Sequence, residues 1–346
     1  MDFKIDKSNM RQMILDFPKQ FPEGIKCAKH ICLDNNLLWQ RVENIIICGM
    51  GGSGLPGDIL VTLQPLDIFA YKDYGLPLQA GNESLIICIS YSGNTEEVIS
   101  SFQEAIKRRL PLISITRGGK LAKLSKQHNV PLAKIPPPYI PPRLALGYQF
   151  GALIKALSNL NLVPEKLIQE TIQLSKILAP EKLEAKAKKL AQKVFKKIPI
   201  IYSSRKFKEV GMIWKNSLNE TAKILAICNY FPELNHNETV GFWKINERQI
   251  SNKKLYIIIL RDIEGSQPRL LRQMEIAKKL IEKEGVKVEF VDIEGKNMLE
   301  KIFSSVILGY WLSYYLAILY GVDPTPVETI IDFKKKLAKN KIKFLD

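Results

Sequence analysis

Two short loops rich in glycine and hydroxyl side chains are the first places where this sequence predicts chemistry. The first loop, Gly49–Gly54, follows an apolar run and fits the pattern G-x-G-x-x-G. Glycines in such a turn let the main chain approach a ligand closely and direct its N–H groups at an anion. The same pattern is the fingerprint of dinucleotide-binding proteins, and Asp73 could serve as the acid that binds the ribose. This loop alone therefore leaves an NAD-dependent dehydrogenase open.

The second loop, Ser90–Thr95, carries three hydroxyl side chains and opens a helical stretch. The hydroxyls of Ser90, Ser92 and Thr95, together with the free N–H groups at the start of a helix, form a compact set of neutral donors suited to one phosphate group. The alternative is that Thr95 or Asn94 only caps the helix. Because a cap needs one hydroxyl and this loop offers three, we interpret it as a phosphate-binding loop.

Parallel strands must position both loops. Short apolar runs alternate with helical stretches along the chain, which is typical of a parallel sheet covered by helices on both faces. The pattern predicts strands at 44–48, 67–71, 85–90, 111–116, 131–135, 198–202, 223–228, 255–260 and 286–291, and helices at 95–109, 144–157, 181–197, 267–283 and 298–320. We therefore expect an α/β protein of two successive units with parallel five-stranded sheets, connected through a proline-rich segment at 136–142.

Composition and charge limit the partners. The chain has 346 residues, with 51 Lys and Arg against 35 Asp and Glu, which gives a formal net charge of +16. This length suits two domains, and the charge indicates either an anionic partner such as a phosphorylated metabolite or only a lysine-rich surface. No RNP motif, zinc finger or arginine-rich arm is present, so we expect no nucleic acid partner. An odd number of cysteines and a start without an apolar signal region predict a reduced, cytoplasmic protein.

The segment Ile302–Val322 carries no charged side chain and is long enough to cross a bilayer. Its tyrosines run through the middle of the segment, whereas those of a membrane-spanning helix gather at its ends. We therefore expect no membrane association, and we predict a helix buried between a sheet and a partner subunit.

The pattern S-x-S-G-x-T after a strand, paired with an earlier G-x-G-G-S loop, resembles the sugar isomerase (SIS) domain family. The wider chain resembles the bifunctional phosphoglucose/phosphomannose isomerases of that superfamily. The matching segments span nearly the whole chain and are Gly49–Ser53, Ser90–Thr95, Pro142–Arg143, Gly147–Tyr148, Asn219–Glu220, Asn235–Glu238 and Asp323–Pro326. The chain departs from the family pattern at Gly54–Gly57, where Pro56 could change the path of the first loop.

The resemblance implies two SIS-type doubly wound α/β/α domains, here residues 1–155 with the phosphate-binding loops and residues 156–346 with the catalytic Glu and His. It implies that the substrate phosphate is bound by Gly52, Ser53, Ser90, Ser92 and Thr95. It also implies an aldose–ketose isomerase that interconverts glucose 6-phosphate and mannose 6-phosphate with fructose 6-phosphate. Such an enzyme acts as a homodimer on a small sugar phosphate and needs no cofactor or metal.

This isomerisation moves a proton between C1 and C2 through an enediolate. It needs a base, a group that opens the sugar ring and a cation beside the developing oxyanion. A carboxylate serves as the base when partial burial raises its pKa. Glu220, near the end of a helical stretch, and Glu238 are both candidates, and the residues alone do not rank them. The resemblance selects Glu220, because Asn219–Glu220 matches the family's base.

Three further residues complete the predicted centre. His236 lies in a polar turn and can exchange protons with the ring oxygen and the C1 hydroxyl near neutral pH, and the family match assigns it ring opening. Arg143 carries a permanent charge that suits an enediolate. Lys334 matches the family's second ring-opening residue, with Lys335 and Lys336 as adjacent alternatives.

Other functions stay open at this stage. Cys27, His30 and Cys32 form the one metal-like cluster in the sequence, but a structural zinc site needs four ligands, so we predict no metal. Besides the dehydrogenase that would use Gly49–Gly54, a non-catalytic sugar-phosphate sensor is possible, since SIS domains also serve as binding modules in regulators.

Replacing the hydroxyls of the second loop tests the phosphate assignment. We expect Ser92→Ala and Thr95→Ala each to raise KM for sugar phosphates, by about 1–3 kcal/mol of lost charge-assisted hydrogen bonding, with little change in melting temperature. Steady-state kinetics and thermal unfolding of the same samples measure both effects. A large fall in melting temperature with an unchanged KM would instead support a helix cap.

Overall fold

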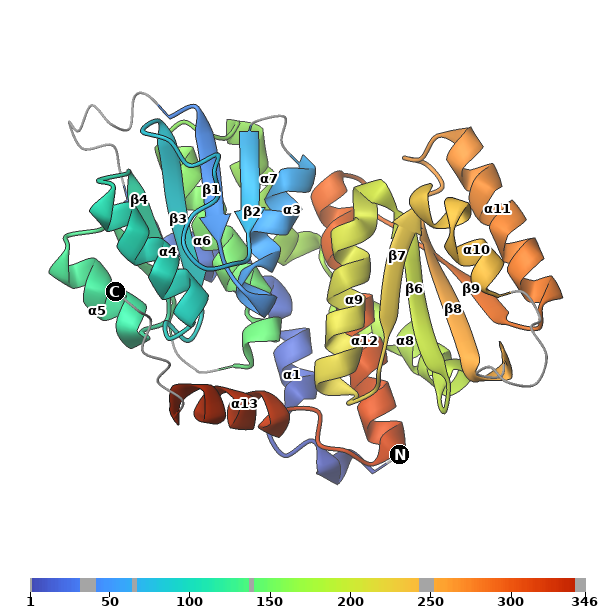
Figure 1. Cartoon of the computed structure of the whole chain (residues 1–346). Helices are drawn as coiled ribbons and strands as arrows, with labels where there is room; N and C mark the ends of the chain where they lie inside the picture. Colours follow the sequence, from blue (N-terminus) through green and yellow to red (C-terminus); the bar gives the residue numbers. More distant parts are fainter. Residues whose placement is uncertain (1, 32–41, 64–66, 137–139, 243–251, 340–346) are drawn as a thin grey trace.

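The computed structural model describes residues 2–31, 42–63, 67–136, 140–242 and 252–339, which form two α/β units, each built on one parallel sheet (Figure 1). The strands are β1 (Asn44–Cys48), β2 (Asp67–Tyr71), β3 (Ser84–Ser90), β4 (Leu112–Thr116), β5 (Leu132–Lys134), β6 (Ile198–Ser204), β7 (Ile227–Phe231), β8 (Leu255–Arg261) and β9 (Lys287–Asp292). The first sheet has the order β2-β1-β3-β4-β5 and the second has the order β7-β6-β8-β9.

The helices pack on both faces of the sheets. They are α1 (Met10–Leu15), α2 (Gln20–Cys27), α3 (Leu55–Leu63), α4 (Glu96–Lys107), α5 (Gly119–Gln127), α6 (Leu146–Asn159), α7 (Glu165–Ile177), α8 (Pro180–Val194), α9 (Lys208–Thr221), α10 (Glu238–Gly241), α11 (Pro268–Lys283), α12 (Met298–Tyr320) and α13 (Glu328–Lys339). Short 3-10 helices are η1 (Phe3–Ile5), η2 (Phe17–Lys19), η4 (Gly51–Ser53), η5 (Pro142–Leu144), η6 (Arg205–Phe207), η7 (Glu233–His236) and η8 (Asn252–Lys254).

Alternating side chains of the first sheet fill two separate cores. Ile46 and Cys48 of β1 pack with residues of α4 and α5, while Ile45 and Ile47 join the larger core that includes α6. β1 lies between β2 and β3, so the strand order reverses beside it. In open parallel sheets, ligands bind outside the carboxyl ends of the strands at such a switch point. Both predicted phosphate loops leave the sheet there, directly after β1 and β3.

The second sheet repeats this design with β6 beside the switch point. Ile201 joins the core that contains α9 and α12, whereas Ile200 packs on the opposite face with residues of α11. Among the described residues this sheet has four strands, where five were expected. The strand predicted at 223–228 begins only at Ile227, because Lys223 has a φ of 60° and turns the chain after α9.

The long apolar helix α12 has the bounds that the sequence predicts. It is long and apolar enough to cross a membrane, yet most of it is buried inside the protein, against α1, α7, α8 and α9. At Gly309 a Cβ atom would lie 2.6 Å from Trp214 Cδ1, so α9 packs very closely on α12. Because this cover comes from the same chain, the expectation that a partner subunit covers the helix is wrong.

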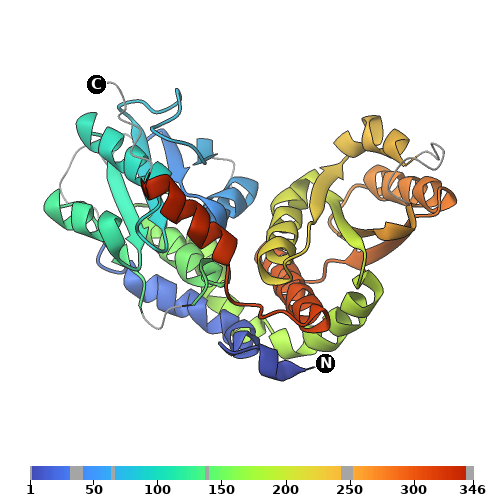
Figure 2. The ribbon, with the colours of Figure 1, turned by 60° about the horizontal axis from the view of Figure 1, so that its bottom comes forward.

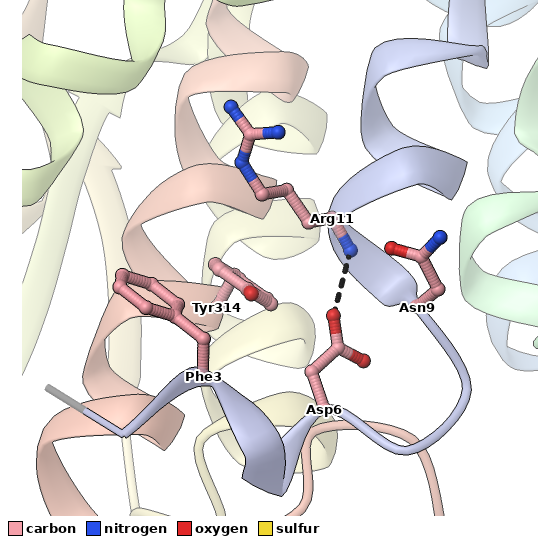
Figure 3. A pocket seen from close by; sticks show the side chains of 5 residues that line it. All are labelled: Phe3, Asp6, Asn9, Arg11 and Tyr314. Atoms are coloured by element: carbon pink, nitrogen blue, oxygen red, sulfur yellow. Dashed lines mark hydrogen bonds between the residues drawn. The ribbon is translucent and has the colours of Figure 1, made fainter.

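The N-terminal segment packs beside Tyr314 of α12 (Figure 3). Both carboxylate oxygens of Asp6 accept main-chain hydrogen bonds at the start of α1, from Met10 at 2.7 Å and Arg11 at 3.0 Å. The guanidinium of Arg11 pairs with Glu184, at 2.8 and 2.7 Å. A hollow of about 300 Å³ remains, lined by Phe3, Asp6, Asn9, Arg11 and Tyr314. Since its charged groups already serve the fold, we interpret this hollow as structural.

After α12 the chain returns to the first unit. Gly321, in the left-handed conformation with φ of 69°, ends α12, and residues 322–327 lead into α13. In both views α13 lies beside the first unit (Figures 1 and 2). Asp323 fixes the intervening turn, because its carboxylate accepts from the main-chain N–H of Thr325 at 2.9 Å. This path carries residues of the C-terminal helix toward the junction of the two units.

Candidate active site

The first predicted phosphate loop is pressed against the chain that follows the first sheet. Gly51 has a φ of 51°, which favours glycine. A Cβ atom on Gly52 would lie 2.8 Å from the carbonyl oxygen of Pro142 and 3.0 Å from the Cα of Arg143. Glycine is therefore required at position 52 so that η5 can approach the loop. The departure at Pro56 leaves α3 intact, since proline is tolerated in the first turn of a helix.

Hydroxyl groups connect the two loops. The Ser53 hydroxyl accepts from the main-chain N–H of Tyr91 at 2.9 Å, which leaves its own hydrogen for donation. The hydroxyls of Ser90 and Thr95 lie 2.9 Å apart, and that of Ser92 accepts from Asn94 N–H at 3.3 Å. Thr95 occupies the N-cap position of α4, but its side chain makes no capping hydrogen bond. The arrangement favours the phosphate-binding interpretation over the helix cap.

A pair of glycines that the sequence analysis missed supports the second loop. Gly93 has a φ of 71°, and a Cβ atom there would lie 1.8 Å from the carbonyl oxygen of Gly118. Lys120 N–H donates to the Asn94 side chain at 3.0 Å, and Leu121 N–H donates to the Gly93 carbonyl at 2.8 Å. The turn between β4 and α5 thus holds the loop in place. The sequence signal was the Gly118–Gly119 pair directly after an apolar strand.

Arg143 connects the first unit to the second. Its side chain is only 4% exposed, and its Nε donates to the Thr221 hydroxyl at 2.9 Å. Its Nη2 donates to the carbonyl oxygens of Pro324 at 2.8 Å and Thr325 at 3.0 Å. The main-chain carbonyl of Arg143 accepts from the Tyr310 hydroxyl at 2.7 Å. These contacts fix the guanidinium between the end of α9 and the turn before α13.

Glu220, in the last turn of α9, lies in ion-pair contact with this arginine. Its Oε2 is 3.6 Å from Arg143 Nη1, and its side chain is 27% exposed. Burial raises the pKa of Glu220, although the charges of Arg143, Lys223 and Lys334 act in the opposite direction. The carboxylate is therefore a stronger base than an exposed glutamate, and it loses this capacity when the pH falls below the raised pKa.

The structure brings Lys334 toward the same centre. Lys334 is exposed on α13, and of the three adjacent lysines it is the one whose charge acts on Glu220. Lys336 instead pairs with Asp332 at 2.8 Å. A hollow of about 650 Å³ opens between α9 and the start of α13, lined by Asn219, Glu220, Lys223, Val322, Asp323, Pro326, Val327, Glu328, Thr329 and Ile330. Lys223 is a residue of this site that the sequence analysis had placed in a strand.

The other two candidates lie elsewhere. Glu238 accepts hydrogen bonds at both carboxylate oxygens, from the Tyr202 hydroxyl at 2.6 Å and from the Asn229 side chain at 2.5 Å. Burial raises the pKa of Tyr202, and the hydrogen bond to this carboxylate raises it further. Its oxygens are engaged within the second unit, so Glu220 is the freer of the two carboxylates. His236 is exposed at the end of η7, and in the described part of the chain it is not among the charges that act on Glu220.

The metal-like cluster of the sequence does not assemble in the described residues. Cys27 Sγ donates to the Glu23 carbonyl at 3.1 Å, and His30 Nε2 lies 3.0 Å from the Leu132 carbonyl. Cys32 lies outside the described residues. In the ranges that the structure covers, no three His, Cys, Asp or Glu side chains are grouped so that they could hold a metal ion.

Two doubly wound parallel sheets, with glycine- and hydroxyl-rich loops at the switch point of the first, are the architecture of a sugar isomerase (SIS) protein. Residues 183–337 match the model of the bacterial phospho-glucose isomerase C-terminal SIS domain. The bifunctional phosphoglucose/phosphomannose isomerase of Caldicellulosiruptor bescii is 34% identical over 346 residues, which are 96% of this chain and 100% of that protein. The corresponding protein of Aquifex aeolicus is 34% identical over 303 residues, 86% of this chain and 91% of its own. The chain therefore belongs to the family of bifunctional phosphoglucose/phosphomannose isomerases.

A solved structure shares the two-unit fold at much lower sequence identity. The C-terminal domain of glucosamine-fructose-6-phosphate aminotransferase from Francisella tularensis superimposes with a TM-score of 0.67 at 16% identity. The match covers 92% of this chain and 98% of that domain. This likeness extends the fold assignment over both units.

Exchanging each carboxylate for an amide distinguishes the two glutamates. We expect Glu220→Gln to bind substrate and lose catalysis by roughly a thousandfold or more, as for removal of a general base. Glu238→Gln should have a milder effect on kcat, because its oxygens serve Tyr202 and Asn229. Steady-state kinetics and substrate binding of both variants provide the comparison. The opposite ranking would show that Glu220 is not the base.

Proposed function

We propose that this protein interconverts glucose 6-phosphate and mannose 6-phosphate with fructose 6-phosphate. The observation that carries the proposal is the position of Arg143. Its main chain lies against Gly52 of the predicted phosphate loop, and its guanidinium lies 3.6 Å from the Glu220 carboxylate. A sugar phosphate whose phosphate group occupies the two loops would have its reacting carbons near a base and a permanent cation.

Each group has one role in the proposed reaction. The loop hydroxyls of Ser53, Ser90, Ser92 and Thr95 and the main chain at Gly52 hold the phosphate. His236 and Lys334 open the sugar ring. Glu220 then moves the proton between C2 and C1, and the charge of Arg143 stabilises the enediolate oxygen. Both aldoses pass through the same enediolate, so one base that reaches either face of C2 serves both substrates.

A direct assay tests the reaction and its independence from metals. We expect purified protein to convert both glucose 6-phosphate and mannose 6-phosphate to fructose 6-phosphate with a chelator present, because an ionised carboxylate and fixed cations supply the needed acid–base chemistry. Coupled detection of fructose 6-phosphate measures both rates. Loss of activity on chelation would exclude the metal-free mechanism.

The same samples separate the competing functions. A protein that binds fructose 6-phosphate but converts neither aldose would be a sensor. Tight binding of a nicotinamide cofactor to Gly49–Gly54, with a spectral change on adding substrate, would indicate a dehydrogenase. Either result would contradict the isomerase proposal.

We further propose that the protein acts as a cytoplasmic homodimer in which His236 enters the partner's site. His236 follows β7, which is an edge strand of the described sheet. Apolar side chains at the start of β7 and on α10 are exposed, namely Leu225 at 68%, Ile227 at 44% and Val240 at 67%. A two-fold symmetric dimer interface would cover these residues and place the two His236 side chains symmetrically. The free thiols of the described cysteines suit a reducing compartment.

Mixed dimers test this arrangement. Glu220→Gln and His236→Ala homodimers should each be nearly inactive. A mixed dimer of the two variants, purified through two different affinity tags, contains one intact site, formed by Glu220 of one chain and His236 of the other. We therefore expect roughly half of the wild-type activity. Inactive mixed dimers, or a fully active monomer by light scattering, would contradict the proposal.

A further inference from the structure

Lys223, which follows the end of α9, has a left-handed backbone conformation that is uncommon for lysine. α9 ends at Thr221 with Ala222 as its C-cap, and Lys223 follows with a φ of 60°. Glycine is the usual residue in this left-handed position, because a side chain there costs conformational free energy. Lys223 also follows Glu220 by only three positions. A lysine in this position places its side chain at the candidate site, where it lines the same hollow as the predicted base Glu220.

The contacts of Lys223 point to that role. Its Nζ donates to the main-chain carbonyl of Glu220 at 2.6 Å and reaches the carbonyl of Pro324 at 3.4 Å. The Pro324 carbonyl also accepts from Arg143 Nη2 at 2.8 Å. Two cations from different units thus converge on one carbonyl oxygen. The end of the helix that carries the base is thereby held to the turn that leads to α13 and Lys334.

Charged groups surround this ammonium from every neighbouring element. Arg143 comes from η5, Glu220 from α9, Asp323 from the turn after α12 and Glu328 from the first turn of α13. Although the Lys223 residue is exposed, desolvation of its ammonium and the repulsion of Arg143 lower its pKa to about 8. Asp323, Glu220 and Glu328 oppose this change. The ammonium is therefore charged below about pH 8 and loses its proton above it.

We propose that Lys223 is a positioning residue of the isomerase reaction, which holds the last turn of α9 and the Asp323–Thr325 turn in register and keeps a positive charge facing the Glu220 carboxylate. The inference rests on the proposed function, because it gives Lys223 a task only if Glu220 is the base. It makes a prediction that a purely structural lysine would not: removing the side chain should harm the reaction far more than the fold.

Glycine substitution separates these two effects. Lys223→Gly relieves the left-handed backbone but also loses the hydrogen bonds to the Glu220 and Pro324 carbonyls. Since these effects on stability oppose each other, we expect a melting temperature close to that of the wild type and a kcat about ten- to a hundredfold lower. KM for fructose 6-phosphate should change little, because the predicted phosphate loops are untouched. Lys196 is the matched control, since it occupies the same position after α8 with a φ of 62°. Lys196→Gly relieves the same left-handed conformation away from Glu220 and should retain full activity.

The charge itself is tested by pH. Wild-type kcat should decline as the pH rises through about 8, where Lys223 loses its proton. Lys223→Arg keeps a permanent charge, so it should retain most of the activity and shift this decline to higher pH. An unchanged pH profile in Lys223→Arg, or a fully active Lys223→Gly, would overturn the inference.

A readout without turnover keeps this inference distinct from the proposed function. Carboxyl ¹³C NMR follows the titration of Glu220 directly. Lys223→Gly should raise the Glu220 pKa, because a cation that lowers it has been removed, whereas Lys196→Gly should leave it unchanged. An unaltered Glu220 titration in Lys223→Gly would refute the inference even if the enzyme isomerises. A wild-type protein with no isomerase activity would refute the proposed function, and the titration would still decide whether Lys223 acts on Glu220.

Discussion

The buried guanidinium of Arg143 is the interaction on which the rest of this centre depends. The main chain of Arg143 lies against Gly52 of the first predicted phosphate loop, while its guanidinium donates to Thr221 at the end of α9 and to Pro324 in the turn before α13. A buried arginine is stable only when its donors are satisfied, and removing a partner from a buried ion pair typically costs about 3–5 kcal/mol. The geometry of the candidate site therefore follows from the requirement to pair this charge.

The same arrangement sets the basicity of Glu220, the proposed base. Burial raises the pKa of Glu220, and three cations hold that rise in check. The pKa of Glu220 in the folded protein lies above its ordinary value. Ionisation of this carboxylate therefore lowers the stability of the fold at pH values above the raised pKa, and this loss of stability disappears as the pH falls through that pKa. A partly desolvated carboxylate beside fixed cations is the form of base that proton abstraction requires.

The two units divide the work by the way each is built. The first contributes two loops at the carboxyl ends of β1 and β3. Glycines there permit close main-chain approach, and loop hydroxyls form hydrogen bonds within and between the two loops. The second contributes α9, which is fixed on the buried helix α12. Trp214 of α9 packs closely on Gly309 of α12, and its indole N–H donates to the Ser305 carbonyl at 2.8 Å. A rigid helix packed in a core positions a catalytic side chain more accurately than a loop does.

The sequence by itself determined the features that depend on local pattern. The loops predicted to bind phosphate stood out because a strand, a glycine-rich turn and a helix start are encoded within a few residues. Helix α12 kept its predicted bounds because an apolar run of that length forms only a buried or a membrane helix. The division into residues 1–155 and 156–346 stays a prediction. For the base, the residues alone left Glu220 and Glu238 unranked.

Only the tertiary structure decided which groups meet. Contacts between distant segments engage both Glu238 oxygens, cover α12 with its own chain and press Gly118 against Gly93. Such contacts also place Lys223 beside Pro324. Such contacts leave no periodic signal in the sequence, because they depend on how whole elements pack. Local residue patterns fix dihedral angles and amphipathic faces, whereas the convergence of residues 143, 220, 223 and 324 is a property of the folded chain.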